Sequence, residues 1–346
     1  MDILKKLPMP DNMKKSEIVD LLLKEEYGYL PPAPQKWEVE NVEEAGFTFC
    51  AGKAQLFKIT LKCKLEKGEF SLPVYYTRLA DSENKAPCFV MINFRDDVPD
   101  RYLPSEELVD AGYAVLSFCY KDVTSDDADF TNGLAGVVYK NGERTATQCG
   151  KIGLWSWAAM RVMDYALTLP ELDHSKISVV GHSRLGKTAL LTGAIDERFF
   201  CAFSNDSGCS GAALSREKSQ ENENIEMICT NFPYWFSEHY KMYINNEDAL
   251  PFDQHFLIAA NVPHRVYVSS AVEDLWADPD KEYLSCVAAS SYYKKHGMKG
   301  FVSDKALPEV CDVFHDGHIG YHLRKGKHYL SREDWNRYIE FLAKEN

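Results

Sequence analysis

The stretch ISVVGHSRLGKT, residues 177–188, fits two unrelated catalytic patterns at once. From Gly181 to Thr188 it reads G-x-x-x-x-G-K-T, which is typical of a loop that binds the phosphates of a nucleotide. From Gly181 to Leu185 it reads as a nucleophile elbow, G-x-S-x-G, with Leu185 in place of the second glycine. Both patterns need a strand before them and a helix after them, and the neighbouring residues supply both. The rest of the chain must therefore decide between them.

Eight strand-like runs indicate an α/β sheet. They cover residues 54–63, 69–78, 87–94, 113–120, 176–181, 201–206, 264–271 and 318–324. The first two alternate and predict an antiparallel hairpin, whereas the later ones are short apolar runs, typical of parallel strands covered on both faces. Helical patterns cover residues 16–26, 150–168, 186–196, 252–260, 280–296 and 331–344. The last of these begins with a capping box formed by Ser331 and Asp334.

The order of these elements favours the elbow. A nucleotide-binding loop needs an acidic residue at the end of an apolar strand to hold Mg²⁺, and the nearest candidate, in RVYVSSAVED, lies several residues past its run. An elbow after the fifth of eight strands is typical of α/β-hydrolases. We therefore predict a single α/β-hydrolase domain over residues 1–346, with a mostly parallel eight-stranded sheet in a three-layer α/β/α sandwich. Residues 1–50 are predicted to form a helical and irregular extension, and residues 207–262 an insertion over the sheet.

Composition excludes several classes of partner. A net charge of −13 over 346 residues disfavours nucleic acid and anionic membranes, because both attract a surplus of Lys and Arg. No apolar run reaches the roughly 18 residues that span a bilayer, and the first residues lack the apolar core of a signal peptide, so we expect a cytoplasmic protein. The ten cysteines form no C-x-x-C pair and lie mostly in apolar runs, which is typical of reduced, buried thiols and not of a metal site.

An elbow serine needs a histidine and an acid later in the chain. His328 follows the last strand in a glycine-containing loop, from which it can take a proton from Ser183. The acid is either Asp206, after the sixth strand, or Asp274, after the seventh. We favour Asp274, with Asp206 as a secondary contact or a loop stabiliser. The test is a carboxylate oxygen about 2.6–3.2 Å from Nδ1 of His328.

Six motifs together resemble carbohydrate esterase family 15, the glucuronoyl esterases, in its bacterial branch. They are GHSRLGK, SNDSGCSGAALSR, FPYWF, LPFDQH, EDLWADP and GYHLRKGKH with the later DW, and the resemblance runs from about residue 85 to the C-terminus. The elbow of that family reads G-C-S-R-x-G-K, so Leu185 and Gly186 fit the pattern of the family.

The resemblance implies a role for each matching residue. Ser183 is the nucleophile, and Arg184 adds a guanidinium to the oxyanion site. Lys187 hydrogen-bonds sugar hydroxyls, although on its own it reads as a solvated charge on a surface turn. Trp276 stacks on the sugar ring. Glu223 lies near the place of a sugar-binding acid, but the surrounding SQENEN departs from the family pattern, and Asp206 stands where many members have glutamate.

The elbow, the histidine and the acid predict a serine esterase that works by two-step acyl transfer, and the family resemblance implies that it cleaves esters of (4-O-methyl-)glucuronic acid. The expected substrate is a small uronate ester or an oligosaccharide fragment, and the chemistry requires no metal or organic cofactor. The same residues serve acetyl-xylan esterases and other carboxylesterases, so these stay open as alternatives. A non-catalytic carbohydrate-binding protein is a third alternative, which would keep Trp276 without needing Ser183 and His328.

Overall fold

The protein is built on one continuous mixed sheet. The computed structural model describes residues 3–44, 49–80 and 84–344. Within them, ten strands form a sheet of order β1-β2-β3-β5-β4-β6-β7-β8-β10-β9. The strands are β1 (Lys36–Glu44), β2 (Ala54–Leu65), β3 (Gly68–Leu79), β4 (Ala86–Asn93), β5 (Ala114–Cys119), β6 (Leu172–His182), β7 (Cys201–Asn205), β8 (Arg265–Ala271), β9 (Val313–Phe314) and β10 (Ile319–Arg324).

All eight predicted strands are present, but the count of eight is wrong. The structure adds β1 and the two-residue β9 at the two edges of the sheet. In the sequence of β1, KWEVENVEE, charged and polar residues interrupt the apolar ones, so no apolar run indicates a strand. Backbone pairing with β2 holds β1 in place. The prediction that residues 1–50 form only a helical and irregular extension is wrong for this strand; residues 1–2 and 45–48 of that range lie outside the described residues.

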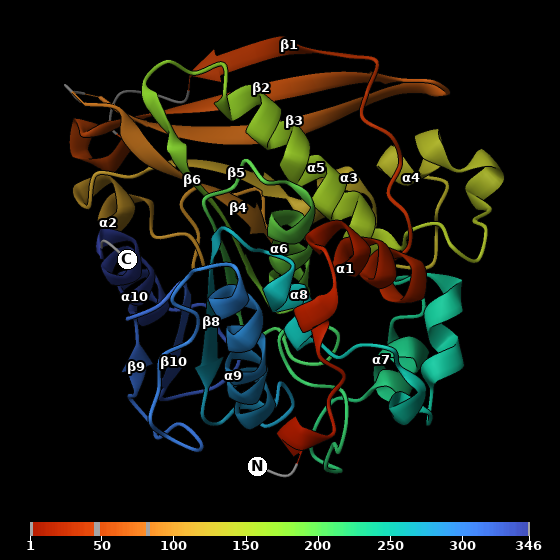
Figure 1. Cartoon of the computed structure of the whole chain (residues 1–346). Coiled ribbons are helices and arrows are strands. Elements are labelled where there is room, and N and C mark those ends of the chain that lie inside the picture. The colour runs from red at the N-terminus through yellow and green to blue at the C-terminus, as the bar shows by residue number, and fades with distance from the viewer. Residues whose placement is uncertain (1–2, 45–48, 81–83, 345–346) are drawn as a thin grey trace.

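Parallel pairing begins at β5 and brings the functional loops to one edge. Strands β1, β2, β3 and β5 pair antiparallel, and the pairs along β5, β4, β6, β7, β8 and β10 are parallel. At the far edge, β9 pairs antiparallel with β10. Figure 1 shows β1, β2 and β3 at the top of the molecule, away from β8 and β10. The carboxyl ends of β6, β7, β8 and β10 share one edge of the sheet, where ligands bind in open α/β folds.

Ten α-helices lie in the described part of the chain, besides short 3-10 and π-helical turns. They are α1 (Lys15–Leu22), α2 (Ser105–Asp110), α3 (Tyr120–Val123), α4 (Gly133–Val138), α5 (Lys151–Ala166), α6 (Arg184–Ile195), α7 (Ile225–Asn231), α8 (His255–Ala259), α9 (Pro279–Lys295) and α10 (Arg332–Ala343). The six predicted helices are present, and the capping box of Ser331 and Asp334 opens α10 as predicted. Helices α2, α3, α4 and α7 were not predicted, because helices of four to seven residues show too few turns for periodicity to appear.

Helices pack on both faces of the sheet, with one apolar core on each face, which gives the predicted three-layer α/β/α arrangement. Side chains from α5, α6, α8 and α9 pack in one large cluster with one face of the sheet. Residues of α2 and α10, among them Trp335, Tyr338 and Phe341, pack against Phe89 and Phe203 on the other face. Eight of the ten cysteines are buried, as their apolar surroundings predict. No helix in the described ranges is both long and apolar enough to cross a bilayer.

Candidate active site

Ser183 lies at a sharp turn between β6 and α6. Its backbone has φ 58° and ψ −127°, a left-handed conformation that is rare outside glycine. A Cβ at Gly181 would stand 2.0 Å from the carbonyl oxygen of Leu185, so only glycine fits there. Leu185 itself is buried, and the close packing falls one residue later, where a Cβ on Gly186 would meet the Asn205 carbonyl oxygen at 3.1 Å. The elbow therefore forms without a glycine at 185.

Lys187 is buried, which corrects the view of it as a solvated charge on a surface turn. Its ammonium donates to the carbonyl oxygens of Ser207 and Cys209, at 2.5 Å each, and lies 3.4 Å from a carboxylate oxygen of Glu223. These three protein acceptors match the three protons of an ammonium group. The geometry does not fit a phosphate-binding loop, whose lysine must reach the ligand. Lys187 contacts only one carboxylate oxygen of Glu223, so the second oxygen is available to accept a hydrogen bond from a ligand.

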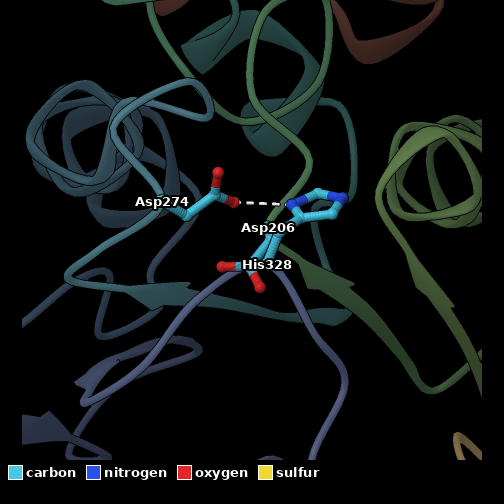
Figure 2. A group of neighbouring side chains, drawn as sticks. All are labelled: Asp206, Asp274 and His328. Carbon is cyan, nitrogen blue, oxygen red and sulfur yellow. Dashed lines mark hydrogen bonds and ion pairs between the residues drawn. The ribbon is translucent and has the colours of Figure 1, made fainter.

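His328 and Asp274 form the predicted contact. Nδ1 of His328 lies 2.6 Å from Oδ2 of Asp274, within the range set for the orienting acid. Figure 2 shows the carboxylate of Asp274 directed at the imidazole ring. The side chain of Asp274 is 6% exposed and that of His328 is 42% exposed, so a buried anion faces an accessible ring. A carboxylate at Nδ1 fixes the tautomer in which Nε2 is free to accept a proton.

Asp206 lies in the same group but supports the loops. One carboxylate oxygen accepts a hydrogen bond from the backbone N–H of Ala271, at 2.8 Å. The other accepts from the backbone N–H of Tyr329 and from the guanidinium of Arg324, at 3.2 Å each. Asp206 thus joins the ends of β8 and β10 directly beside His328, which agrees with the expected loop-stabilising role.

The same three residues are the one group of possible metal ligands in the described part of the chain. Asp206, Asp274 and His328 each place a ligand atom within 4.8 Å of the others. However, Asp274 is engaged by the ring of His328, and Asp206 by the guanidinium of Arg324. A cation bound here would break the contact between His328 and Asp274, and it would lie beside the positive charge of Arg324. These residues therefore do not favour a metal ion.

Arg184 is held by residues that the sequence analysis did not assign. Its guanidinium forms an ion pair with Asp126 and lies 4.6 Å from the ring centre of Trp235 and 5.4 Å from that of Phe232. Asp126 also accepts a hydrogen bond from Nε1 of Trp235 at 2.8 Å. The motif FPYWF contains both aromatic residues, but its sequence alone does not reveal their contact with Arg184.

All eight candidate residues line one cavity of about 310 Å³. The remaining lining residues are Ser207, Gly208, Phe232, Trp235 and Ala277. Trp276 is 45% exposed, so it belongs to the wall of the cavity and not to the core. The backbone N–H of Glu223 donates to the carbonyl oxygen of Trp276 at 3.0 Å, which joins the two walls.

Glu282 supports the floor of this cavity and was missed in the sequence. One of its carboxyl oxygens accepts from the backbone N–H groups of Ser207 and Gly208, at 2.9 Å each. The other lies 2.5 Å from the hydroxyl of Ser270. Burial raises the pKa of Glu282 to about 7. Glu282 lies near the start of α9, where an acidic residue is common, so the sequence does not indicate this role.

Comparisons with known proteins place these features among carbohydrate esterases. A family model described as "Glucuronyl esterase, fungi" matches residues 59–297. The chain is 42% identical over 238 residues to "Carbohydrate esterase MZ0003" of an unknown prokaryotic organism, covering 68% of this chain and 54% of that relative. The chain thus spans about half the length of this curated relative. It is also 26% identical over 298 residues to "4-O-methyl-glucuronoyl methylesterase 1" of Wolfiporia cocos, covering 83% of this chain and 68% of that protein.

Solved structures agree with these matches. The structure of a glucuronoyl esterase from Solibacter usitatus superposes with a TM-score of 0.85 and 29% identity, covering 96% of this chain and 92% of that one. A structure described as a promiscuous CE15 esterase from a marine bacterial metagenome gives a TM-score of 0.84 and 30% identity, covering 96% of this chain and 91% of that one. The similarity therefore extends over almost the whole fold.

Proposed function

Because the chain belongs to the glucuronoyl esterase family, carbohydrate esterase family 15, we propose that it hydrolyses small esters of (4-O-methyl-)glucuronic acid. The observation that carries the proposal is the hydrogen-bonded pair of His328 and Asp274 in the cavity of the elbow serine. The name of a fungal relative, a 4-O-methyl-glucuronoyl methylesterase, supports the substrate class.

The proposed reaction has two steps. The hydroxyl of Ser183 attacks the C6 carbonyl carbon of the uronate ester while Nε2 of His328 takes its proton, and Asp274 stabilises the imidazolium. The tetrahedral oxyanion is held by backbone N–H groups at the start of α6 and by Arg184. His328 then returns the proton to the leaving alcohol. In the second step, His328 activates a water molecule, which releases the uronic acid and restores Ser183.

The walls of the cavity suit a monosaccharide. Trp276 offers an indole face to the apolar side of a sugar ring, and Glu223 offers a carboxylate to its hydroxyl groups. We assign Lys187 to holding Glu223 in place, because its own protons are directed at protein oxygens. This changes the role that the family resemblance implied, from direct contact with sugar hydroxyls to support of the residue that makes them.

A panel of four esters tests this function: methyl glucuronate, methyl galacturonate, acetylated xylose and p-nitrophenyl acetate. We expect the highest kcat/KM on methyl glucuronate and complete loss on all four in Ser183→Ala. Faster turnover of acetylated xylose would favour an acetyl-carbohydrate esterase instead. A folded protein that cleaves none of the esters and forms no adduct with a serine-directed phosphonate would favour a carbohydrate-binding protein.

A further inference from the structure

His182, the residue before the elbow serine, packs against the ring of His328. The two ring centres lie 4.4 Å apart, with the planes tilted by 42°. Tyr102 and Phe94 surround His182 further out, at 5.4 and 6.0 Å between ring centres. His182 is 2% exposed, so His328 rests on a ring that cannot move into solvent.

The hydrogen bonds of Asn205 fix which nitrogen of His182 carries the proton. The amide nitrogen of Asn205 lies 3.2 Å from a carboxylate oxygen of Asp334 and 3.0 Å from the hydroxyl of Ser269. Burial alone would raise the pKa of Asp334, but the hydrogen bond from His322 and nearby positive charges keep it below the ordinary value.

Because Asp334 is therefore an ionised acceptor, the amide group of Asn205 can take only one orientation. Its oxygen then faces Nδ1 of His182 at 2.6 Å, and this nitrogen must be the donor. The neutral ring therefore carries its proton on Nδ1 and leaves Nε2 without one.

The surroundings keep this ring uncharged. Burial, followed by the neighbouring His328, lowers the pKa of His182 to about 3. The charged and titratable groups that face it are His328 from the loop after β10, Asp334 from α10 and Arg324 from β10, and Asn205 and Tyr102 are its neutral polar neighbours. At the pH of the reaction His182 is thus a neutral ring with a fixed tautomer.

We propose that His182 is a positioning residue for His328. Asp274 holds the edge of the His328 ring at Nδ1, and His182 supports its face, so the two contacts together define the direction of Nε2. The neutral ring of His182 also presents a π face to the imidazolium that forms when Ser183 loses its proton. The inference rests on the proposed acyl-transfer chemistry, and it requires only that His328 is the base, not that the substrate is a uronate.

Two matched variants separate the ring contact from the hydrogen bond to Asn205. His182→Gln keeps a donor for Asn205 but removes the ring, whereas His182→Phe keeps a ring but removes the donor. In His182→Gln we expect kcat to fall about fivefold to thirtyfold, the range between an exposed and a desolvated ring–cation contact, because His328 is partly exposed. KM should change less than twofold. In His182→Phe we expect a loss of about threefold at most. A loss in His182→Phe as large as that in His182→Gln contradicts the proposal.

A double-mutant cycle gives the decisive readout. In a His328→Ala background, His182→Gln should cause no further loss of the residual turnover of p-nitrophenyl acetate, because the residue acts through a ring that is no longer there. An equal fold loss in both backgrounds would indicate a general deformation of the elbow and overturn the proposal. Running the cycle on p-nitrophenyl acetate separates it from the substrate assignment, since failure on methyl glucuronate alone refutes only the proposed function.

A spectroscopic measurement on the wild-type protein keeps the test independent of how the variants fold. Two-bond ¹H–¹⁵N correlation of the histidine rings should report His182 as the neutral Nδ1–H tautomer throughout the pH range in which activity is measured. A charged His182, or the opposite tautomer, would refute the arrangement.

Discussion

Replacing Asp274 by asparagine removes the charge that faces His328 while keeping the size of the side chain. The imidazolium that forms on attack lies within hydrogen-bonding distance of the carboxylate, at 2.6 Å between Nδ1 and Oδ2. Two unit charges about 4 Å apart, at an effective dielectric constant of about 20, attract by about 4 kcal/mol. His328 is 42% exposed, so solvent screens part of this attraction. We therefore expect a loss of about 2–4 kcal/mol of transition-state stabilisation, or about 30-fold to 1000-fold in kcat.

The assay compares Asp274→Asn with Asp206→Asn under identical conditions. Single-turnover hydrolysis of p-nitrophenyl acetate measures the acylation step, and thermal melts report stability. Asp206 binds Arg324 and two backbone N–H groups, so its replacement should lower the melting temperature more than Asp274→Asn does and reduce kcat less than tenfold. A larger loss of kcat in Asp206→Asn than in Asp274→Asn would refute this assignment of the acid.

Two further predictions concern the cavity, and a third concerns Glu26, a buried residue after α1 whose carboxyl group accepts hydrogen bonds from Gln254. Asp126→Asn should reduce kcat by about tenfold with little change in KM, because Arg184 loses the partner that orients its guanidinium. An unchanged kcat in steady-state assays would show that Arg184 does not stabilise the oxyanion. Trp276→Ala should raise KM for methyl glucuronate but not for p-nitrophenyl acetate, without changing the melting temperature, since this indole is 45% exposed. Burial raises the pKa of Glu26 from 4.5 to about 7. Between these two pH values only the unfolded chain releases this proton, so the free energy of unfolding falls by up to about 3 kcal/mol as pH rises. Glu26→Gln should therefore become more stable relative to wild type between pH 5 and pH 8 in thermal melts, whereas a pH-independent difference would count against a buried, protonated Glu26.

The fold and the elbow could be predicted because their signals are local. The apolar run before Gly181 marks a buried strand, and the packing of that glycine against Leu185 leaves no alternative residue. Strand β1 (Lys36–Glu44) lacks such a signal, because its pairing depends on the backbone of β2 and its side chains alternate with charges.

The environment of the site residues depends on contacts between distant segments. The sequence indicates that Arg184 follows the serine, but its partner Asp126 lies 58 positions earlier in an irregular loop. Lys187 occupies the first turn of a helix, where a lysine is usually solvated; it is buried because the backbone after β7 folds over it. The sequence gives no sign of the role of His182 either, since its contact with His328 joins the last residue of β6 to the loop after β10.

The short segment from Asp274 to Ala277 carries both the acid that orients the base and the indole on the cavity wall. Its backbone is closed by successive turns, with Asp274 donating to Ala271 and Ala277 donating to Asp274. A redesign that alters the backbone of this segment, such as an insertion or a deletion, would therefore also displace the acid and reduce turnover. The wall formed by Phe232 and Trp235 belongs to a separate segment. Both rings contact Arg184, and Trp235 additionally donates a hydrogen bond to Asp126, the partner of Arg184. Phe232 is thus the position at which libraries can vary substrate preference with the least disturbance to the proton-transfer residues.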